Sequence, residues 1–369
     1  MMVEKLNKGE WSEFYAFVKI LGDRELVAAN SDLTPDYDNS YGILKVLRDD
    51  PETSRTYDLS DDAQVTVTLR SLQGRETSDV SYEDIQSRTP RLFKEIVAGS
   101  GASFRVHSAE ELMGLLKCGK IKAASGKKGD IEILVHDYVT NKENKVEFSI
   151  KSYLGGMPTL LNASKATNFK FSVDGFSGDA DAVNGIATGR KVMDRLKTVK
   201  RAGGTFSLSG MHSPVFKRNL LKIDSAMPLF LGQFLLLFFA GEARTLEELT
   251  KRVADDGTAL DSLGDPFNFE DLKYKMKQLL INVALGMVPA TDWTGFLKAD
   301  GGYIVVKEDG DVVCFHIYNI DQLGEYLFNN TKLETASTTR HDFASLFSEG
   351  DDLFMNLNLS IRFMKTPAG

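Results

Sequence analysis

Two short segments in which apolar and polar residues alternate, at 130–139 and 146–151, limit the folds open to this 369-residue chain more than any other stretch of it. A period of two places every second side chain on the same face of a strand. A polar run at 140–145 separates the segments and is typical of a turn. The sequence therefore predicts a β-hairpin whose apolar face carries Ile131, Ile133, Val135, Val146, Phe148 and Ile150.

The opposite face of this hairpin collects side chains that carry chemistry, namely Asp130, Glu132, Glu147, Ser149 and Lys151. A turn centred on 140 and 141 pairs Asp130 with Lys151 and Glu132 with Ser149. A register shifted by four would keep the face but change these partners. Carboxylates gathered beside a lysine repel one another unless a cation offsets their charge, which indicates a metal site. The alternative is an ordinary salt bridge on a sheet surface.

The remaining periodicity predicts an α/β (α+β) fold, with a mixed sheet flanked by helices and an additional C-terminal region of helices and a hairpin. The hairpin forms the centre of the sheet, is continued by a strand near 169–173, and is flanked by helices at 90–97 and 189–199. Further helices are expected at 11–29, 108–116, 213–221, 229–240 and 271–285, a strand at 64–69, and a second hairpin at 303–318 that turns at Asp309-Gly310.

Three regions are expected along the chain. They are an N-terminal region at 1–80, a core with basic helices at 81–240, and a C-terminal helical and hairpin region at 241–369, where the charge changes sign. Either terminal region is a candidate for recognition of a partner.

Composition narrows the class of protein. Hydrophobic residues make up 42% and charged residues 26%, which is typical of a folded, soluble chain. Cys118 and Cys314 stand alone, so a disulfide framework or a zinc site is excluded. The first ten residues hold no apolar run like that of a signal peptide, and the apolar stretch at 228–240 is shorter than the roughly twenty residues of a membrane span. We expect a cytoplasmic protein with no membrane partner and read 228–240 as a core helix.

The net charge is −8, yet the cations are concentrated. The segment 186–222 contains nine lysines and arginines against a lone Asp194, and five lysines precede Asp130 between 117 and 128. Because phosphate binding depends on the local potential rather than on the total charge, these segments favour a nucleic-acid partner. A solvated basic face is the alternative.

The string Gly129-Asp130 followed by Ser149-Ile150-Lys151 resembles the PD-(D/E)XK nuclease core. In that core a strand aspartate and an acid on the next strand bind Mg²⁺, and the lysine assists the attacking water. The sequence departs from the pattern at Gly129, where a proline is usual, and at Ser149, where an acid is usual. The second acidic ligand is therefore open between Glu132, Glu147 and Glu95, the last on the helix that precedes the hairpin.

A longer series of residues is similar to the HpaII restriction endonuclease family and runs in the same order over most of the chain. It comprises Lys122-Ala123, Ser125, Gly129-Asp130-Ile131, His136-Asp137, Phe148 to Ser152, Leu154-Gly155, Pro158 to Ser164, Thr167 to Phe169, Asn219-Leu220, Ile223-Asp224, Arg340-His341, Leu357 to Leu359 and Ile361 to Phe363.

The resemblance implies a restriction-endonuclease-like core and a type II site-specific deoxyribonuclease that depends on Mg²⁺, with CCGG as the site of the name-giving member. It implies that Asp130, the carbonyl of Ile150 and one of Glu132 or Glu95 hold the metal, while Lys151 orients water beside Ser149. Its expected partners are double-stranded DNA, a second copy of the chain on that DNA, and a cognate methyltransferase that acts in the same system without direct contact.

Polar residues outside the hairpin are candidates for DNA contacts. They are Asn162, Ser164, Thr167 and Asn168 just after the catalytic strand, Lys217 and Arg218 in the basic segment, and Arg340 with His341. Arg340 could grip a guanine edge. Turn-forming side chains and a surface loop are the alternatives. Two other functions remain open: a repair or junction-resolving nuclease of the same superfold without a fixed sequence, and an inert DNA-binding protein.

Overall fold

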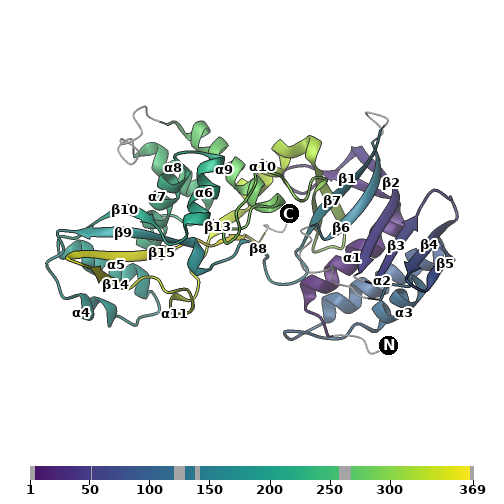
Figure 1. Cartoon of the computed structure of the whole chain (residues 1–369), viewed down its shortest axis with the longest axis horizontal. Coiled ribbons are helices and arrows are strands. Elements are labelled where there is room, and N and C mark those ends of the chain that lie inside the picture. Colours follow the sequence, from purple (N-terminus) through teal and green to yellow (C-terminus); the bar gives the residue numbers. More distant parts are fainter. Residues whose placement is uncertain (1–4, 51, 120–128, 138–141, 257–266, 366–369) are drawn as a thin grey trace. The chain divides into compact units, whose positions relative to one another are not determined.

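The computed structural model describes residues 5–50, 52–119, 129–137, 142–256 and 267–365. The chain divides into two compact units (Figure 1). The first contains Met1–Pro158 and Leu297–Tyr326, and the second contains Thr159–Phe296 and Leu327–Gly369. The boundaries expected near residues 80 and 240 do not coincide with this division.

A nine-stranded sheet in the order β1-β12-β11-β7-β6-β2-β3-β4-β5 forms the first unit. Its strands are β1 (Glu25–Ala29), β2 (Pro35–Asp50), β3 (Thr53–Asp58), β4 (Gln64–Ser71), β5 (Gly74–Ser81), β6 (Ile131–Asp137), β7 (Lys142–Ser152), β11 (Gly302–Val306) and β12 (Val312–His316). Because β1 also pairs with β2, the strands from β1 through β12, β11, β7, β6 and β2 close into a ring.

The predicted hairpin at 130–151 is confirmed as β6 and β7. Its predicted register is wrong by two residues, because Ile131 pairs with Phe148 and Glu132 pairs with Glu147. Asp130 therefore lies beside Ser149, and the Asp130 amide donates to the carbonyl of Phe148 at 2.8 Å. The face shared by Asp130, Glu132, Glu147, Ser149 and Lys151 is unchanged by this shift, since side chains alternate along a strand.

The second predicted hairpin is also confirmed, as β11 and β12, but it belongs to the same sheet as the first. Strand β11 runs parallel to β7 and pairs Tyr303 with Ser149 and Val305 with Lys151. Residues 302–316 are thus part of the first unit rather than of a separate C-terminal region.

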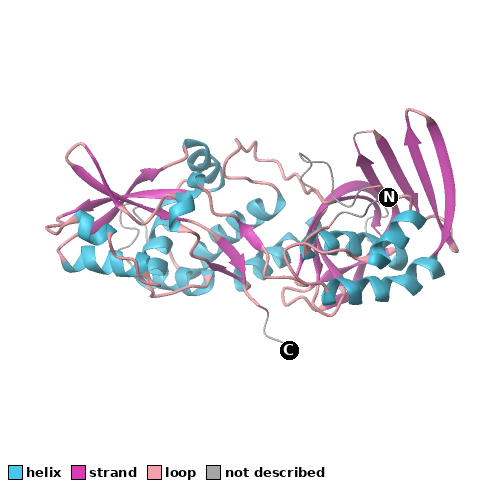
Figure 2. Ribbon diagram, turned by 90° about the horizontal axis from the view of Figure 1, so that it is seen from below, coloured by secondary structure: helices cyan, strands magenta, loops and turns pink. Residues whose placement is uncertain are grey.

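Helices α1 (Lys8–Asp23), α2 (Tyr82–Ala98) and α3 (His107–Leu115) lie on one side of this sheet (Figure 2). Helix α1 begins at a capping box between Asn7 and Glu10 and buries Trp11, Phe14 and Phe17. The prediction of a helix to residue 29 is wrong, because the chain leaves the helix at Arg24, whose φ is 64°, and continues as β1. The 3₁₀ turn η3 (Ile317–Asn319) and the start of α10 (Ile320–Asn329) also lie in this unit.

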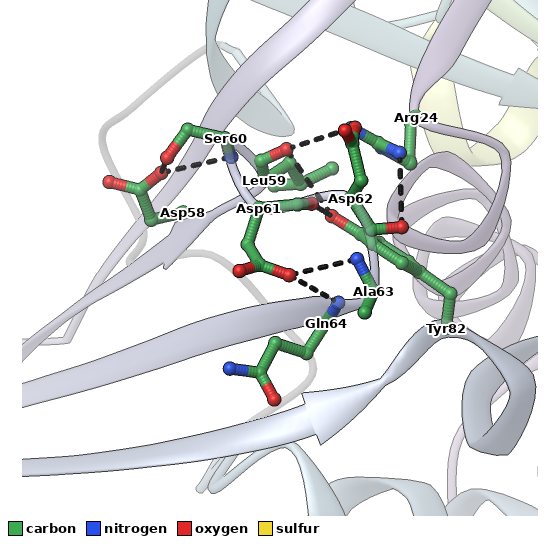
Figure 3. Close-up of polar contacts among 9 residues, drawn as sticks. All are labelled: Arg24, Asp58, Leu59, Ser60, Asp61, Asp62, Ala63, Gln64 and Tyr82. Atoms are coloured by element: carbon green, nitrogen blue, oxygen red, sulfur yellow. Dashed lines mark hydrogen bonds and ion pairs between the residues drawn. The ribbon is translucent and has the colours of Figure 1, made fainter.

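The acidic turn between β3 and β4 is held by its own backbone (Figure 3). Asp58 accepts from the Ser60 amide at 3.1 Å, and Asp61 accepts from the Ala63 amide at 2.8 Å. Arg24 binds Asp62 at 3.0 Å and lies over the Tyr82 ring. The three aspartates therefore fix a turn and are not a metal cluster.

The second unit contains two smaller sheets. One has the order β10-β9-β15-β14 and the other β13-β16-β8. Their strands are β8 (Thr159–Leu161), β9 (Asn168–Asp174), β10 (Thr205–Met211), β13 (Thr331–Leu333), β14 (Leu346–Glu349), β15 (Asp352–Asn358) and β16 (Ile361–Phe363). The strand expected near 169–173 exists as β9, but the prediction that it continues the hairpin sheet is wrong, because β9 pairs with β10 and β15.

The helices of the second unit surround these sheets. They are η1 (Lys165–Thr167), α4 (Ala180–Asn184), α5 (Lys191–Arg201), α6 (Pro214–Ile223), α7 (Met227–Ala240), α8 (Leu246–Asp255), α9 (Phe269–Leu285) and α11 (Thr338–His341). Helix α5 is the helix expected at 189–199, and it flanks the second unit's sheet rather than the hairpin. The apolar stretch expected as a core helix is α7, which is largely buried.

Among the described residues, no single helix is long and apolar enough to cross a membrane. Helices α6 and α7 satisfy that criterion only as a pair, and the pair is bent by 109°.

Candidate active site

Asp130 lies immediately before β6, at the open end of the hairpin. Residues of β7 hold its carboxylate in place. The Ile150 amide donates to Asp130 Oδ2 at 2.6 Å, and Ser149 Oγ donates to the same oxygen at 3.3 Å. Burial raises the pKa of Asp130, although these hydrogen bonds and the nearby Lys151 oppose the shift. One carboxylate oxygen is thus held in place, and the group keeps some affinity for a proton or a cation.

Ser149 and Lys151 follow each other on the same face of β7, as expected. Ser149 is buried and serves as a donor to Asp130. Lys151 is half-buried and close enough to influence the pKa of both Asp130 and Glu13. The predicted neighbourhood of Asp130, Ser149 and Lys151 is therefore present, with Ser149 rather than Lys151 directly across from Asp130.

Glu13 is a further acid near Asp130 that the sequence did not predict. It projects from α1, which packs against β7. Burial and the neighbouring Asp130 raise the pKa of Glu13 to about 7, and Lys151 partly offsets the rise. The available signal was a single acid between Trp11 and Phe14 on an otherwise apolar face, but nothing in the local pattern connects that helix with the hairpin.

Glu132 and Glu95, two of the acids predicted as possible metal ligands, have partners away from Asp130. Glu132 forms an ion pair with Lys145 at 2.6 Å, across the hairpin. Burial alone would raise the pKa of Glu95, but bonds from Ser108 and Arg91 lower it below its usual value. Neither residue is among the groups that shift the pKa of Asp130. Glu147 lies opposite Glu132 in the ladder, and its amide donates to Asp300.

The donors at this site suit a hard divalent cation. In the described residues, no group of three or more His, Cys, Asp or Glu side chains converges closely enough to hold a metal. Mg²⁺ in proteins is commonly held by one or two carboxylates and keeps several waters. The mutually repelling carboxyl groups of Asp130 and Glu13, with the carbonyl of Ile150, whose amide binds Asp130, match that smaller set, because a cation would offset their repulsion.

Residues 7–363 match the family described as HpaII restriction endonuclease. The chain belongs to the HpaII restriction endonuclease family. It is 34% identical over 365 residues to the type II restriction enzyme HpaII of Haemophilus parainfluenzae, and the alignment covers 97% of this chain and 98% of that protein. No solved structure matches.

As a member of the HpaII family, the chain is a type II restriction endonuclease, a hydrolase of DNA. Among the residues expected to contact DNA, Thr167 and Asn168 are buried. Asn358 donates to both of their side chains, and Asn168 donates to the carbonyl of His341 at 2.9 Å. These contacts favour a structural role for Thr167 and Asn168.

The other DNA-contact candidates have more exposed positions. Asn162, Lys217 and Arg340 are exposed, and Arg218 is exposed but paired with Asp292 at 2.9 Å. Ser164 is half-buried and begins η1, and His341 ends α11. The residues Lys122, Ala123 and Ser125, which contribute to the family resemblance, lie outside the described residues, as do Lys120, Lys127 and Lys128.

Proposed function

We propose that this endonuclease hydrolyses double-stranded DNA at a short symmetric site, CCGG as in the family's name-giving member, with Mg²⁺ as cofactor and a PD-(D/E)XK core. The observation that carries the proposal is the grouping of Asp130, Glu13 and Lys151 around the end of the β6–β7 hairpin. Two carboxylates, one beside the hairpin strands and one on α1, and a lysine on β7 are the groups that this chemistry requires.

Asp130 and Glu13, with the carbonyl of Ile150, would hold the metal. A bound Mg²⁺ would supply positive charge that stabilises the negative charge growing on the phosphate during attack. Glu13 takes the place that the pattern assigns to an acid at Ser149, and Ser149 instead fixes Asp130 through its hydroxyl. In this arrangement Glu132 and Glu95 are not required as ligands.

Lys151 acts on the substrate side of the same site. Its ammonium group would orient the attacking water and offset charge on the phosphate. The short link through Ile150, whose amide binds Asp130 at 2.6 Å, keeps lysine and aspartate in a fixed relation. Such preorganisation lowers the cost of arranging charges when the reaction occurs.

Double-stranded DNA is the proposed partner, bound by a homodimer, with a cognate methyltransferase that protects the same site without direct contact. Arg340 is the proposed reader of a guanine edge, with Asn162 and Lys217 as phosphate contacts. Both cysteines of the described part are free and buried, which supports the proposed cytoplasmic location.

The test is cleavage of plasmid DNA in Mg²⁺, followed by mapping of the ends. Asp130→Ala and Lys151→Ala should each lower cleavage by at least 10³-fold and leave DNA affinity largely intact, because affinity depends mainly on cations elsewhere. Ser149→Ala should lower cleavage less, since it removes one of two hydrogen bonds to Asp130. Lys145→Ala is the matched control on the same strand and should cleave normally.

Near-native cleavage by Lys151→Ala would show that the hairpin is not the active site. Ends scattered over the plasmid, rather than located at one sequence, would favour the alternative of a nuclease without a fixed site.

A further inference from the structure

A cavity of about 570 Å³ lies within the second unit. It is formed by the residues that begin α5, those at the end of α7 and just beyond it, and the segment that leads into α11. Its volume falls within the roughly 300–1,000 Å³ that is usual for sites that bind small molecules. The cavity therefore has room for a group the size of a nucleotide.

The charge of this cavity is of one sign. Arg190, Lys191 and Arg244 line it, and none of the residues that line it is an aspartate or glutamate. In a chain with a net charge of −8, three cations without an acid are a local concentration of positive potential. Neither Arg190 nor Lys191 forms an ion pair with any described residue. The cavity is therefore suited to an anion.

Hydroxyl groups add hydrogen-bond donors to the same wall. Thr335, Ser337, Thr338 and Thr339 line the cavity, as does Thr188, whose hydroxyl donates to Asp194. Thr338 is 9% exposed, and its hydroxyl forms no hydrogen bond within the described residues but is not among their fully buried polar atoms. The hydroxyl is therefore available to donate to an oxygen of a ligand in the cavity. Helix α5 also begins here, and its N-cap, Arg190, makes no side-chain capping bond.

Part of the cavity lining is apolar, and a glycine lies beside it. Met193, Phe238 and Phe239 make up this part, which we call the apolar floor. Gly241 has a φ of +83°, and a Cβ there would lie 2.8 Å from Met193 Sδ. A side chain at this position would therefore be strained and would crowd the cavity. Cations and hydroxyls around an apolar floor suit a phosphate group joined to a sugar.

We propose that this cavity is a subsite for one backbone phosphate of the bound DNA, together with its sugar. Arg190, Lys191 and Arg244 would neutralise the phosphate, Thr338 would donate to one of its oxygens, and the apolar floor would contact the sugar. The assignment rests on the proposed function and adds to it the place on the second unit where the DNA backbone is held.

The first experiment measures DNA affinity against salt concentration in EDTA, where DNA is not cleaved. Each neutralised phosphate of duplex DNA contributes about −0.9 to the slope of log K against log salt. The double variant Arg190→Ala/Lys191→Ala should have a slope that is less negative by about 1, and it should bind DNA at least 10-fold more weakly near 0.1 M salt. The matched control is Lys197→Ala/Lys200→Ala, which removes two exposed cations from the same helix outside the cavity.

Equal changes in both double variants would show that α5 is a general basic face, and no change in either would show that the cavity does not meet DNA. Both results would overturn the proposal.

The second experiment replaces Thr338 by valine, which keeps the shape and removes only the hydroxyl. Because this hydroxyl bonds to none of the described residues, the melting temperature should not fall. DNA affinity should fall about 3- to 10-fold, as expected for the loss of one hydrogen bond to a charged group. A lower melting temperature with unchanged affinity would show a structural hydroxyl and overturn the assignment.

A third measurement separates the source of the phosphate. Inorganic phosphate and a deoxynucleoside monophosphate are titrated into the wild type and into Arg190→Ala/Lys191→Ala. Binding that depends on these two cations, with DNA affinity that does not, would assign the cavity to a free ligand instead of DNA. If the wild type cleaves no DNA in Mg²⁺, the proposed function is wrong. If the wild type cleaves DNA but the salt slope of Arg190→Ala/Lys191→Ala equals that of the wild type, only the phosphate subsite is wrong.

Discussion

Glu13 is a carboxyl group buried beside a second carboxyl group, so its ionisation costs free energy in the folded protein. Its pKa is 4.5 in an ordinary environment and about 7 here, because of burial and of Asp130. The folded state thus binds a proton more tightly than the unfolded state does. The stabilising contribution of this proton is complete below pH 4.5 and is lost as the pH rises through 7.

Glu13→Gln should remove this dependence on pH. In metal-free buffer at pH 8 the variant should be more stable than the wild type, by at most about 3 kcal/mol for such a shift, and the difference should shrink toward pH 4. Urea unfolding at both pH values measures it. Glu308→Gln, which changes an exposed carboxyl group, is the control. A variant less stable than the wild type at pH 8 would contradict the assigned environment of Glu13.

Tyr303 and Tyr326 are a matched pair of fully buried tyrosines in the first unit. The Tyr326 hydroxyl lies 2.6 Å from that of Tyr153, whereas the Tyr303 hydroxyl has no hydrogen-bond partner in the described residues. Tyr303→Phe should therefore leave the free energy of unfolding unchanged or raise it by about 1 kcal/mol, while Tyr326→Phe should lower it by about 1 kcal/mol or more.

Urea unfolding of the two phenylalanine variants compares them directly, since both lose a single oxygen atom from a packed ring. Equal destabilisation would mean that Tyr303 binds an ordered water molecule that replaces the missing partner.

At the same scale, Asp130, Ser149 and Lys151 could be predicted because they lie within one hairpin, where alternation alone assigns a face. Glu13 could not, because its place beside Asp130 depends on how α1 packs against β7. Thr167 and Asn168 were expected at a DNA surface from their residue types, yet Asn358, far along the chain, draws them into a buried network.

Among the secondary-structure elements, seven helices and both hairpins were predictable because their periodicity is local; the helices are α1, α2, α3, α5, α6, α7 and α9. The register of β6 and β7 was not, since it depends on the geometry of the turn and on the neighbours β2 and β11. Strand β9 was identified but assigned to the wrong sheet, because alternation does not encode the pairing partner. Residues 25–29 were read as the end of a helix, although their pairing with β2 and β12 makes them a strand.

Helix α5 shows that a basic element can use a cation structurally. Arg195 is buried and donates to the carbonyls of Asn184, Ile186 and Ala344. Arg195→Ala should lower the free energy of unfolding by about 2–4 kcal/mol, because several carbonyl groups lose their donor. Lys197→Ala, which removes an exposed cation two residues further along the same helix, should change the free energy of unfolding by less than about 0.5 kcal/mol. Thermal unfolding of the two variants gives the comparison, and equal stability would contradict the buried role of Arg195.

For the whole molecule, each unit combines segments that are distant in the sequence. Residues 297–326 return to the first unit after the second has begun, and they supply β11 and β12 to its sheet. The change in charge near 241–265 suggested a domain boundary there. The boundaries between the units instead depend on which distant segments pair as strands, and the charge of a segment carries no information about its pairing partner. The expected mixture of sheets and helices was confirmed, whereas the expected order of regions along the chain was not.

The proposed homodimer follows from the symmetry of a palindromic site. The chain carries one Asp130–Lys151 pair, and a symmetric duplex site presents two equivalent scissile phosphates, so two copies related by a two-fold axis would place one active site on each strand. A dimer should convert a supercoiled plasmid with one site directly to the linear form, at a rate that rises more steeply than linearly with protein concentration. A single copy would cut one strand, dissociate or turn, and then cut the other, so nicked circles should accumulate first at a rate linear in protein concentration. Gel analysis of early time points separates these outcomes.

Mixing in excess Lys151→Ala chains adds a second readout. A dimer of one active and one inactive copy should produce nicked circles that are not linearised, whereas independent monomers would still linearise the plasmid.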